Sequence, residues 1–453
     1  MKFNETIVSQ ATPPGRGGIS IVRVSGIHTT LVAHKVLGLL PSESRKANYR
    51  EFYDEEGNII DKGIVLWFPA PHSFTGEDVL EFHCHGSPII VDILLKRITT
   101  ISQVRVANPG EFTERAFFNK KLDLIQAEAI EDLINATNQA TARAAFNSLQ
   151  GKFSNLISSL VAVVTDLRVK LESNIDFPNE NVYNVNITEI ENQLNNILIQ
   201  LNEVHNNSFQ GSIIRDSKRV LILGNPNVGK SSLFNVLTRH DTAIVTDVAG
   251  TTRDVLQEII NLDGITIQII DTAGIHPTNN IIEQIGIARA WEQTKIADHI
   301  IFMVDSRDDD QSRQTIENFL DQYSNNVPVT IVKNKIDLIG IPAQITEFIG
   351  QTVISISVLT GDGIKLLCNH IKQNLIVKSI REGNFLARQR HLESLKKAIH
   401  YIENGKKIFF TTHCEELLAE ELRWCHQALN EITGEYTTED LLTQIFSSFC
   451  IGK

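Results

Sequence analysis

The chain has 453 residues, of which 42% are hydrophobic and 21% charged, and its formal net charge at pH 7 is −12. This length predicts about three domains, and the composition excludes a disordered, collagen-like or disulfide-rich chain. No apolar run approaches the ~18 residues of a membrane span. The lack of an apolar leader and an odd cysteine count of five predict a soluble, cytoplasmic protein without membrane association.

Basic residues are not concentrated in any part of the chain. Lys and Arg number 42, against 54 Asp and Glu, and both signs are spread along the sequence. Charge alone therefore does not predict nucleic-acid binding. If the protein acts on a nucleic acid, a local patch or a partner must supply the attraction.

The N-terminal segment, residues 1–120, mixes short β-like runs with Gly/Pro turns. Strands are expected at 19–24 and 63–68, and a helix at 89–98. This pattern predicts a compact α+β domain.

Long amphipathic helices are expected next. No proline occurs between Pro109 and Pro178, and apolar residues recur at helical spacing there and again over 187–204. The same periodicity returns at 385–410, 414–432 and 438–449. Such stripes are typical of helices that pack in a bundle.

Between these helical parts the periodicity changes at Lys218. Strands are expected at 219–223, 256–262, 265–270, 299–304, 327–332 and 353–356, the second and third joined by the hairpin signal Asp263-Gly264. Strands alternating with helices predict a doubly wound α/β domain, inserted in one helical domain because two bundles would need a longer chain. The expected parts are 1–120, 121–217 (helical, first part), 218–378 (inserted) and 379–453 (helical, second part).

A phosphate-binding loop follows the strand at 219–223. Gly224-Asn225-Pro226-Asn227-Val228-Gly229-Lys230-Ser231 matches G-x-x-x-x-G-K-[ST], and a helical pattern comes after it. Backbone amides at a helix N-terminus cradle phosphate oxygens, Lys230 neutralises their charge, and the Ser231 hydroxyl ligates Mg²⁺.

Three further motifs specify guanine and a switch. Asn334-Lys335-Ile336-Asp337 matches N-K-x-D, whose Asp carboxylate accepts from guanine N1–H and the exocyclic amine together. Ser357-Val358-Leu359 stands where a supporting S-A-K loop belongs but departs from it at the second and third positions. Asp271-Thr272-Ala273-Gly274 matches the D-x-x-G switch, in which Asp271 holds Mg²⁺ through water. Their order and spacing predict a P-loop GTPase.

The position after this switch lacks the glutamine that orients water in many small GTPases. Ile275 stands there, and an aliphatic side chain cannot orient water. His276 and Glu283 are the candidates for that role, each of which is otherwise a solvated surface residue.

Neither of two other patterns in the sequence predicts a metal site. On a strand, His83 and His85 would share one face and Cys84 the other, so the three cannot converge on zinc. The run Asp308-Asp309-Asp310 is typical of a solvated loop.

Several stretches closely resemble the tRNA modification GTPase family known as MnmE or TrmE, over essentially the whole chain. They are the opening Thr12-Pro13-Pro14-Gly15-Arg16-Gly17-Gly18, the segments 76–81, 109–112 and 241–254, and the C-terminal 446–453. The resemblance implies an N-terminal domain that binds tetrahydrofolate and dimerises, a helical domain, and a G domain inserted in it.

The resemblance also implies an activity and partners. The family hydrolyses GTP in a K⁺-dependent way as its G domains dimerise. With the FAD-dependent protein MnmG, in a heterotetramer, it adds a carboxymethylaminomethyl or aminomethyl group to C5 of the wobble uridine of certain tRNAs. The implied cofactors are Mg²⁺, K⁺ and 5-formyltetrahydrofolate or a related tetrahydrofolate.

Residue roles carry over position by position. Asn227, Thr246, Val248 and Thr251 would coordinate K⁺, Thr252 would join Ser231 on Mg²⁺, and Glu283 would orient water beside the P-loop Lys230. The implied nucleotide contacts are Asn227, Val228, Gly229, Lys230, Ser231, Ser232, Thr246, Asp247, Val248, Ala249, Gly250, Thr251, Thr252, Asp271, Thr272, Ala273, Gly274, Asn334, Lys335, Asp337, Ser357, Val358 and Leu359.

For folate, the matching positions are Arg23, Glu81, Lys121 and Lys453, each of which alone would pass for a surface charge. Cys450 matches the family's C-terminal C-[ILV]-G-K box; it either serves the modification chemistry or is an incidental thiol in a tail. No arginine finger is evident, and a monovalent cation can neutralise the same developing charge.

A different class of function remains open. A regulatory GTPase whose output is partner binding, as in ribosome assembly, would share the nucleotide motifs but would need neither the folate positions nor the Cys450 box. A dynamin-like membrane GTPase would need a basic amphipathic helix or anchor, and the sequence has neither.

Overall fold

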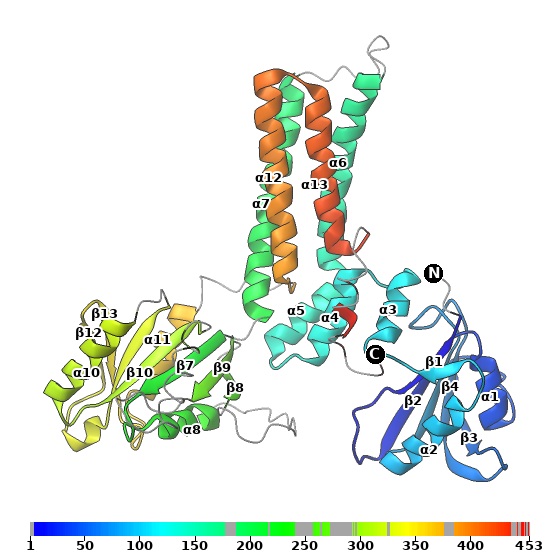
Figure 1. Cartoon of the computed structure of the whole chain (residues 1–453), viewed down its shortest axis with the longest axis horizontal. Coiled ribbons are helices and arrows are strands. Elements are labelled where there is room, and N and C mark those ends of the chain that lie inside the picture. The colour runs from blue at the N-terminus through cyan, green and yellow to red at the C-terminus, as the bar shows by residue number, and fades with distance from the viewer. Residues whose placement is uncertain are drawn as a thin grey trace. The chain divides into compact units, whose positions relative to one another are not determined.

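The computed structural model describes residues 4–176, 187–215, 218–240, 257–262, 265–271, 292, 294, 297–323, 327–375, 385–435, 442, 445–447, 449 and 452. The chain forms two compact units (Figure 1). The first contains residues 1–134, 146–205 and 390–453, and the second contains 135–145 and 206–389. Each unit is described by itself.

The N-terminal part of the first unit is a six-stranded sheet with two helices. Strand order is β3-β4-β5-β2-β1-β6, and all neighbours pair antiparallel except β1 and β6. Alternation along β2 buries Val22 and Val24 against Val32 of α1 and Leu94 of α2. The elements are β1 (Thr6–Gln10), β2 (Ile19–Ser25), α1 (Thr29–Leu37), β3 (Asn48–Tyr53), β4 (Ile59–Phe68), β5 (Val79–His85), α2 (Pro88–Thr99) and β6 (Val104–Val106).

The amphipathic helices expected between 124 and 204 and at 414–432 are confirmed, whereas most of the one expected at 438–449 lies outside the described residues. Leu160, Val164, Leu167 and Leu171 lie buried along one stripe of α6, and α13 packs along this helix. The helices are α3 (Glu111–Phe118), α4 (Leu124–Ile134), α5 (Gln139–Leu149), α6 (Lys152–Asp176), α7 (Ile187–Arg215), α12 (Gln389–Thr412) and α13 (Glu415–Thr433). Within the described ranges, no helix is both long and apolar enough to cross a membrane.

A buried ion pair joins the two helical segments that flank the α/β part. Arg390 of α12 donates through Nε and Nη2 to the two carboxylate oxygens of Glu128 in α4, over 2.9 and 3.0 Å. Arg390 also donates to the carbonyl oxygens of Glu431 and Ile432 at the end of α13. Residues from before and after the α/β part thus form one helical domain, which confirms the predicted insertion.

The inserted part is a seven-stranded sheet of order β12-β13-β11-β10-β7-β9-β8. β12 and β8 run antiparallel at its edges, and the strands between them are parallel. The elements are β7 (Lys218–Gly224), α8 (Lys230–His240), β8 (Gln257–Leu262), β9 (Ile265–Asp271), β10 (His299–Asp305), α10 (Asp309–Gln322), β11 (Val329–Asn334), the 3₁₀ turn η1 (Ile336–Leu338), β12 (Gln344–Phe348), β13 (Gln351–Ser355) and α11 (Ile364–Leu375).

This topology brings the sequence motifs together. In parallel α/β sheets, ligands bind at the carboxyl ends of the strands where strand order reverses. β7 lies between β9 and β10, and the P-loop follows β7. The N-K-x-D motif follows β11, and Ser357 comes two residues after β13. All three motifs therefore lie at one edge of the sheet.

Some predicted boundaries were wrong. The strand expected from Val327 begins at Val329, because Pro328 has no N–H to donate to the ladder. The helix expected from Phe385 begins at Gln389. The buried Phe385 segment is extended there and its carbonyl passes so close to Gly211 that a Cβ would come within 2.2 Å. The edge strand β12 was not predicted.

Candidate nucleotide-binding site

The P-loop connects buried strand β7 to helix α8, as its motif predicts. Gly224 has φ +144° and Gly229 has φ +103°, conformations that L side chains rarely adopt. A Cβ on Gly229 would also lie 2.4 Å from the Asn334 side-chain nitrogen. Glycine at 229 therefore serves both the turn and a close approach by the base-reading loop.

The P-loop lysine is nearly buried. Lys230 begins α8 and is 9% exposed, and its ammonium donates to the carbonyl oxygens of Gly224 and Asn225 over 3.1 and 2.9 Å. Its positive charge is therefore held inside the loop whose amides would cradle a phosphate. Ser231 and Ser232 lie exposed in the same turn of α8.

Asp337 and Ser357 come together as the guanine-reading motifs predict. The Ser357 hydroxyl donates to Asp337 Oδ1 over 2.6 Å, and the Thr360 amide donates to Ser357 Oγ over 3.2 Å. Asp337 itself is exposed, whereas Ser357 is buried. This leaves the second carboxylate oxygen of Asp337 able to accept from a base. The neighbour Leu359 is 87% exposed.

Asn334 couples the base-reading loops to the P-loop. Its side-chain nitrogen donates to the Val228 carbonyl over 2.8 Å, and its side-chain oxygen accepts from the Val358 amide over 3.0 Å. Asn334 is 3% exposed. A buried amide that satisfies three segments at once fixes their relative positions.

Sequence reasoning missed one further contact at this edge. Lys335 donates from Nζ to the Asn227 carbonyl over 2.8 Å and to Asp305 Oδ2 over 2.7 Å. Asp305 ends β10 and also accepts from the Arg307 guanidinium. Hydrogen bonds from Arg307 and then Lys335 hold the pKa of Asp305 far below its usual range. The only sequence signal was an aspartate at the end of a predicted strand.

The switch residues are described only in part. Asp271 ends β9, where its partner on β7 is Ile222, so the D-x-x-G motif begins beside the P-loop strand as predicted. The positions Thr246, Asp247, Val248, Ala249, Gly250, Thr251, Thr252, Thr272, Ala273, Gly274, Ile275, His276 and Glu283 lie outside the described residues.

In the first unit, Arg23 and Glu81 are brought together on neighbouring strands. Arg23 Nε donates to Glu81 Oε1 over 2.8 Å, and the guanidinium lies over the rings of Phe74 and Phe112 at 5.6 and 5.8 Å. Both charged side chains are mostly shielded, at 22% and 13% exposure. The pair is therefore a partly desolvated polar site with an aromatic wall.

Lys121 and the C-terminus approach the same region. Lys121 Nζ donates to the Pro71 carbonyl over 3.0 Å, in the loop that also carries Phe74. Gly452 packs against Gln10, so closely that a Cβ would lie 2.1 Å from its carbonyl oxygen; the residue before Gln10 pairs with Arg23. Lys453 and Cys450 lie outside the described residues.

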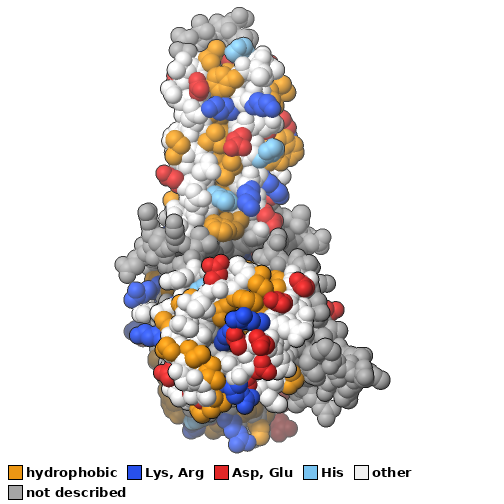
Figure 2. Space-filling view, turned by 90° about the vertical axis from the view of Figure 1, so that its left-hand side faces the viewer, with side chains coloured by type: hydrophobic (Ala, Val, Ile, Leu, Met, Phe, Trp, Pro, Cys, Tyr) orange, Lys and Arg blue, Asp and Glu red, His pale blue; other side chains and the backbone are white. Residues whose placement is uncertain are grey.

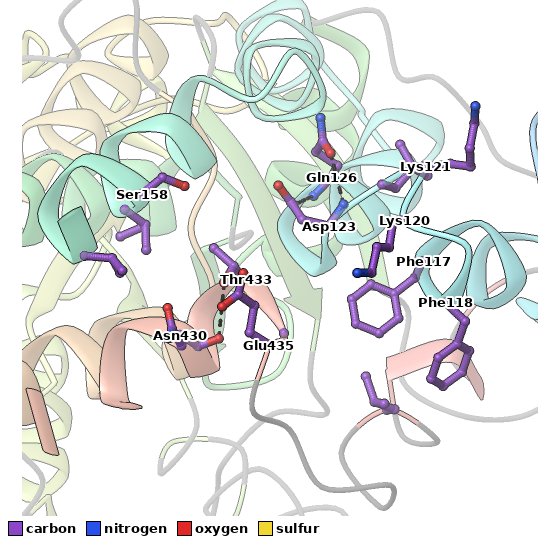
Figure 3. Close-up of a pocket in the computed structure, with 15 residues that line it drawn as sticks. Phe117, Phe118, Lys120, Lys121, Asp123, Gln126, Ser158, Asn430, Thr433 and Glu435 are labelled. Atoms are coloured by element: carbon purple, nitrogen blue, oxygen red, sulfur yellow. Dashed lines mark hydrogen bonds between the residues drawn. The ribbon is translucent and has the colours of Figure 1, made fainter. Parts of the chain in front are cut away.

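A cavity of about 830 Å³ adjoins Lys121 (Figure 3). Lys120 and Phe117 lie side by side on one wall, and Asn430, Thr433 and Glu435 come from the end of α13 (Figure 3). This places room for a small molecule next to one of the residues expected to bind folate.

The expected separation of His83, Cys84 and His85 on β5 is confirmed. Cys84 is 2% exposed, and its thiol donates to the Ser20 carbonyl. Burial raises the pKa of Cys84 to about 11, so this thiol stays protonated. On the same strand, His85 is exposed and contacts Asp61 over 2.7 Å.

Several solved GTPase structures resemble part of this chain. The G domain of FeoB from Methanococcus jannaschii is 23% identical, covering 35% of this chain and 98% of that one with a TM-score of 0.27. The G domain of FeoB from T. maritima is 27% identical, covering 36% and 100%, with a TM-score of 0.28. An Era variant from Aquifex aeolicus bound to GDP·AlF₄⁻ is 25% identical, covering 40% and 66%, with a TM-score of 0.26. We draw no function from these partial likenesses.

Family models cover nearly the whole chain. The model of the N-terminus of the GTP-binding protein TrmE matches residues 6–121, and the model of the MnmE helical domain matches residues 124–450. The P-loop and base-reading motifs lie inside the second match. The chain belongs to the MnmE/TrmE family of tRNA-modification GTPases and is a GTP hydrolase.

Proposed function

We propose that this GTPase is K⁺-dependent and acts as a homodimer with MnmG to add a carboxymethylaminomethyl or aminomethyl group to C5 of the wobble uridine of tRNA. Its domains are 1–120, 121–217 with 379–453, and 218–378, and it works in the cytoplasm. The observation that supports the GTPase part of the proposal is the joining of the P-loop to the base-reading loop through Asn334 and Lys335; the tRNA part follows from the family. One rigid edge then holds the phosphates and guanine of the same GTP.

The described residues fit a guanine nucleotide with Mg²⁺. Lys230 and the loop amides face phosphate, Asp337 accepts from guanine, and Ser357 orients Asp337. Ser231 is the second residue of α8 and Asp271 ends β9 beside β7, so a hydroxyl and a carboxylate, which offer the oxygen ligands that Mg²⁺ prefers, come from neighbouring elements. When bound, Mg²⁺ would neutralise phosphate charge as the γ-phosphate leaves.

A K⁺ role for Asn227 is supported by its conformation. Asn227 has φ +62°, is exposed, and has its carbonyl held by Lys335. The side-chain oxygen of Asn227 would serve as a hard ligand, with Thr246, Val248 and Thr251 as the other proposed ligands. When bound, K⁺ would supply the charge that an arginine finger supplies elsewhere.

The role of orienting the attacking water is assigned to Glu283, because the aliphatic side chain of Ile275 cannot orient water.

A tetrahydrofolate derivative is assigned to Arg23, Glu81, Lys121 and Lys453. The Arg23–Glu81 pair offers both a donor and an acceptor beside the Phe74 ring, which suits a flat heterocycle with polar edges. Cys450 is proposed to act near that site.

The charge on the protein surface gives a reason for expecting a partner protein in tRNA binding. On the face shown in Figure 2, Lys and Arg side chains are interspersed with Asp and Glu. Such a face attracts tRNA weakly. A partner that supplies basic surface, as proposed for MnmG, would compensate.

The cation proposal is tested by measuring GTP turnover in KCl and in NaCl at the same ionic strength. We expect fast hydrolysis in K⁺ and a fall of about 10²–10³-fold in Na⁺, the scale of losing one charge-stabilising group. Equal rates in the two salts would exclude the cation role. A Ser25→Ala variant, altered only in the N-terminal sheet, should keep the salt response of the wild type.

A further inference from the structure

One ammonium group links the P-loop to a strand that carries none of the nucleotide motifs. Lys335 Nζ donates to the Asn227 carbonyl over 2.8 Å and to Asp305 Oδ2 over 2.7 Å. Asp305 is the last residue of β10, the strand between those that precede the P-loop and the N-K-x-D motif. The contact therefore spans three neighbouring strand ends.

Two residues of this link have a left-handed backbone. Asn227 has φ +62°, and Lys335 itself has φ +71°. Left-handed backbone is unfavourable for most residues with a side chain and is tolerated best by Asn, so it is at Lys335 that the surroundings must hold it. The hydrogen bond from Lys335 fixes the direction of the Asn227 carbonyl.

The carboxylate of Asp305 orders the Lys335 ammonium so that it can donate to the Asn227 carbonyl. A lysine side chain has several rotatable bonds, and a neutral carbonyl alone orders its ammonium weakly. A carboxylate 2.7 Å away forms a stronger, charge-assisted hydrogen bond. The two side chains are only 25% and 23% exposed, so solvent screens the pair less than it would a surface pair.

We infer that Asp305 is a positioning residue for the monovalent-cation site: it anchors Lys335, which in turn fixes the backbone of Asn227. The inference rests on the proposed K⁺ role of Asn227. Asp305 would touch neither nucleotide nor cation. Its loss should therefore weaken K⁺ activation more than GTP binding.

A purely local role for Asp305 must be distinguished from this one. Arg307 donates to the same carboxylate from Nε, Nη2 and its backbone amide, so Asp305 also orders the turn before α10. If this turn were the whole role, removing the Arg307 side chain would reproduce the effect of removing Asp305. If Asp305 acts through Lys335, Arg307→Ala should leave K⁺ activation unchanged.

The experiment measures GTP hydrolysis by the full chain as a function of K⁺ concentration, at saturating GTP and Mg²⁺ and constant ionic strength. Asp305→Ala should raise the K⁺ concentration for half-maximal activity by about 10-fold, the scale seen when a residue supporting a metal ligand is lost. Asp305→Asn, which keeps an acceptor for Lys335, should fall between Asp305→Ala and wild type. Asp309→Ala is the matched control, because Asp309 pairs with Lys333 and Arg313 on the same side of the sheet.

Each outcome decides the inference. A raised half-maximal K⁺ in Asp305→Ala, with Arg307→Ala and Asp309→Ala like wild type and GTP affinity changed less, supports it. An unchanged K⁺ response in Asp305→Ala and Asp305→Asn, or an equal shift in Arg307→Ala, overturns it while leaving the cation role intact. A wild type equally active in K⁺ and Na⁺ overturns the cation role itself, and the inference with it.

Discussion

Ser357 Oγ donates a hydrogen bond of 2.6 Å to Asp337 Oδ1. The buried hydroxyl fixes the orientation of the exposed carboxylate, and it uses one lone pair of Oδ1, so both carboxylate oxygens can still accept. This is the geometry needed to accept from a guanine edge. It also explains why only Ser357 of the expected S-A-K positions had to match: Val358 contributes its backbone amide, to Asn334.

Asp337→Asn should shift the base preference from guanine towards xanthine. The substitution replaces one acceptor with a donor, and one mismatched buried polar contact costs about 1–3 kcal/mol, or about 5- to 150-fold in affinity. Competition of GTP and XTP for binding measures it. Ser357→Ala is the control, since it loosens Asp337 but keeps its charge and should weaken both nucleotides alike. GTP affinity unchanged in Asp337→Asn, without any gain for XTP, would show that this loop does not read the base.

Glu283→Ala should slow GTP hydrolysis while leaving GTP affinity nearly intact. A group that orients water acts in the transition state and not in ground-state binding, and losing it typically costs about 10²–10⁴-fold. Single-turnover rates and GTP dissociation constants measured together separate the cases. Loss of affinity along with rate would make Glu283 structural. If neither the rate nor the GTP affinity changes, His276 becomes the candidate for orienting the water.

The position of the nucleotide-binding motifs at one edge of the sheet could be predicted from the sequence. The residues that hold those motifs in place could not. A P-loop after a buried run and N-K-x-D after another run fix which strand ends meet, because parallel strands share one edge. Asp305 carries no such pattern: its role arises from strand order, since β10 lies between β7 and β11. Lys335 belongs to a known motif, yet its contact with Asn227 depends on two left-handed residues that no periodicity reveals.

The N-terminal domain was harder to predict for another reason. Only two strands, at 19–24 and 63–68, were expected there. β6 has three residues, and β3 buries only Phe52 fully, so neither gives a strong period-2 signal. The pairing of Arg23 with Glu81 follows from the register of β2 and β5, which only the resemblance to the family anticipated.

We expect the G domain to lose stability as the pH falls into the mildly acidic range, because of His299. It is fully buried, and its Nε2 lies 2.9 Å from Thr330 Oγ1. Burial, and secondarily His370, lowers the pKa of His299 to about 4 from 6.5. The unfolded state therefore binds the proton first as pH falls, so stability present above about pH 6.5 is lost as the pH drops towards 4, with about 2 kcal/mol lost by pH 5.

Unfolding of wild type and His299→Gln at about pH 7 and pH 5 checks this linkage. Glutamine can still bond Thr330 but does not titrate. The wild type should lose more stability than the variant between the two pH values. Equal losses would mean that His299 is already accessible to protons in the folded state.

Arg390→Ala should destabilise the helical domain strongly. It would leave the carboxylate of Glu128, which is 2% exposed, without its guanidinium partner and facing only the His391 imidazole at 3.1 Å, and breaking a buried pair in this way costs about 3–5 kcal/mol. Arg423→Ala is the matched control, because its pair with Glu420 is about half exposed on both sides and such pairs contribute about 0–1 kcal/mol. Thermal unfolding compares the two. Similar melting temperatures would contradict a structural role for the buried pair.

The most direct test of the central claim is mass spectrometry of wobble uridines in tRNA from cells that lack this chain. The claim is that GTP hydrolysis by this protein drives C5 modification of that uridine. Expression of the wild type should restore the carboxymethylaminomethyl or aminomethyl group. Lys230→Ala, which removes the nearly buried P-loop ammonium, should leave the uridine unmodified despite normal protein levels. Full modification without the chain, or equal restoration by Lys230→Ala, would contradict the account.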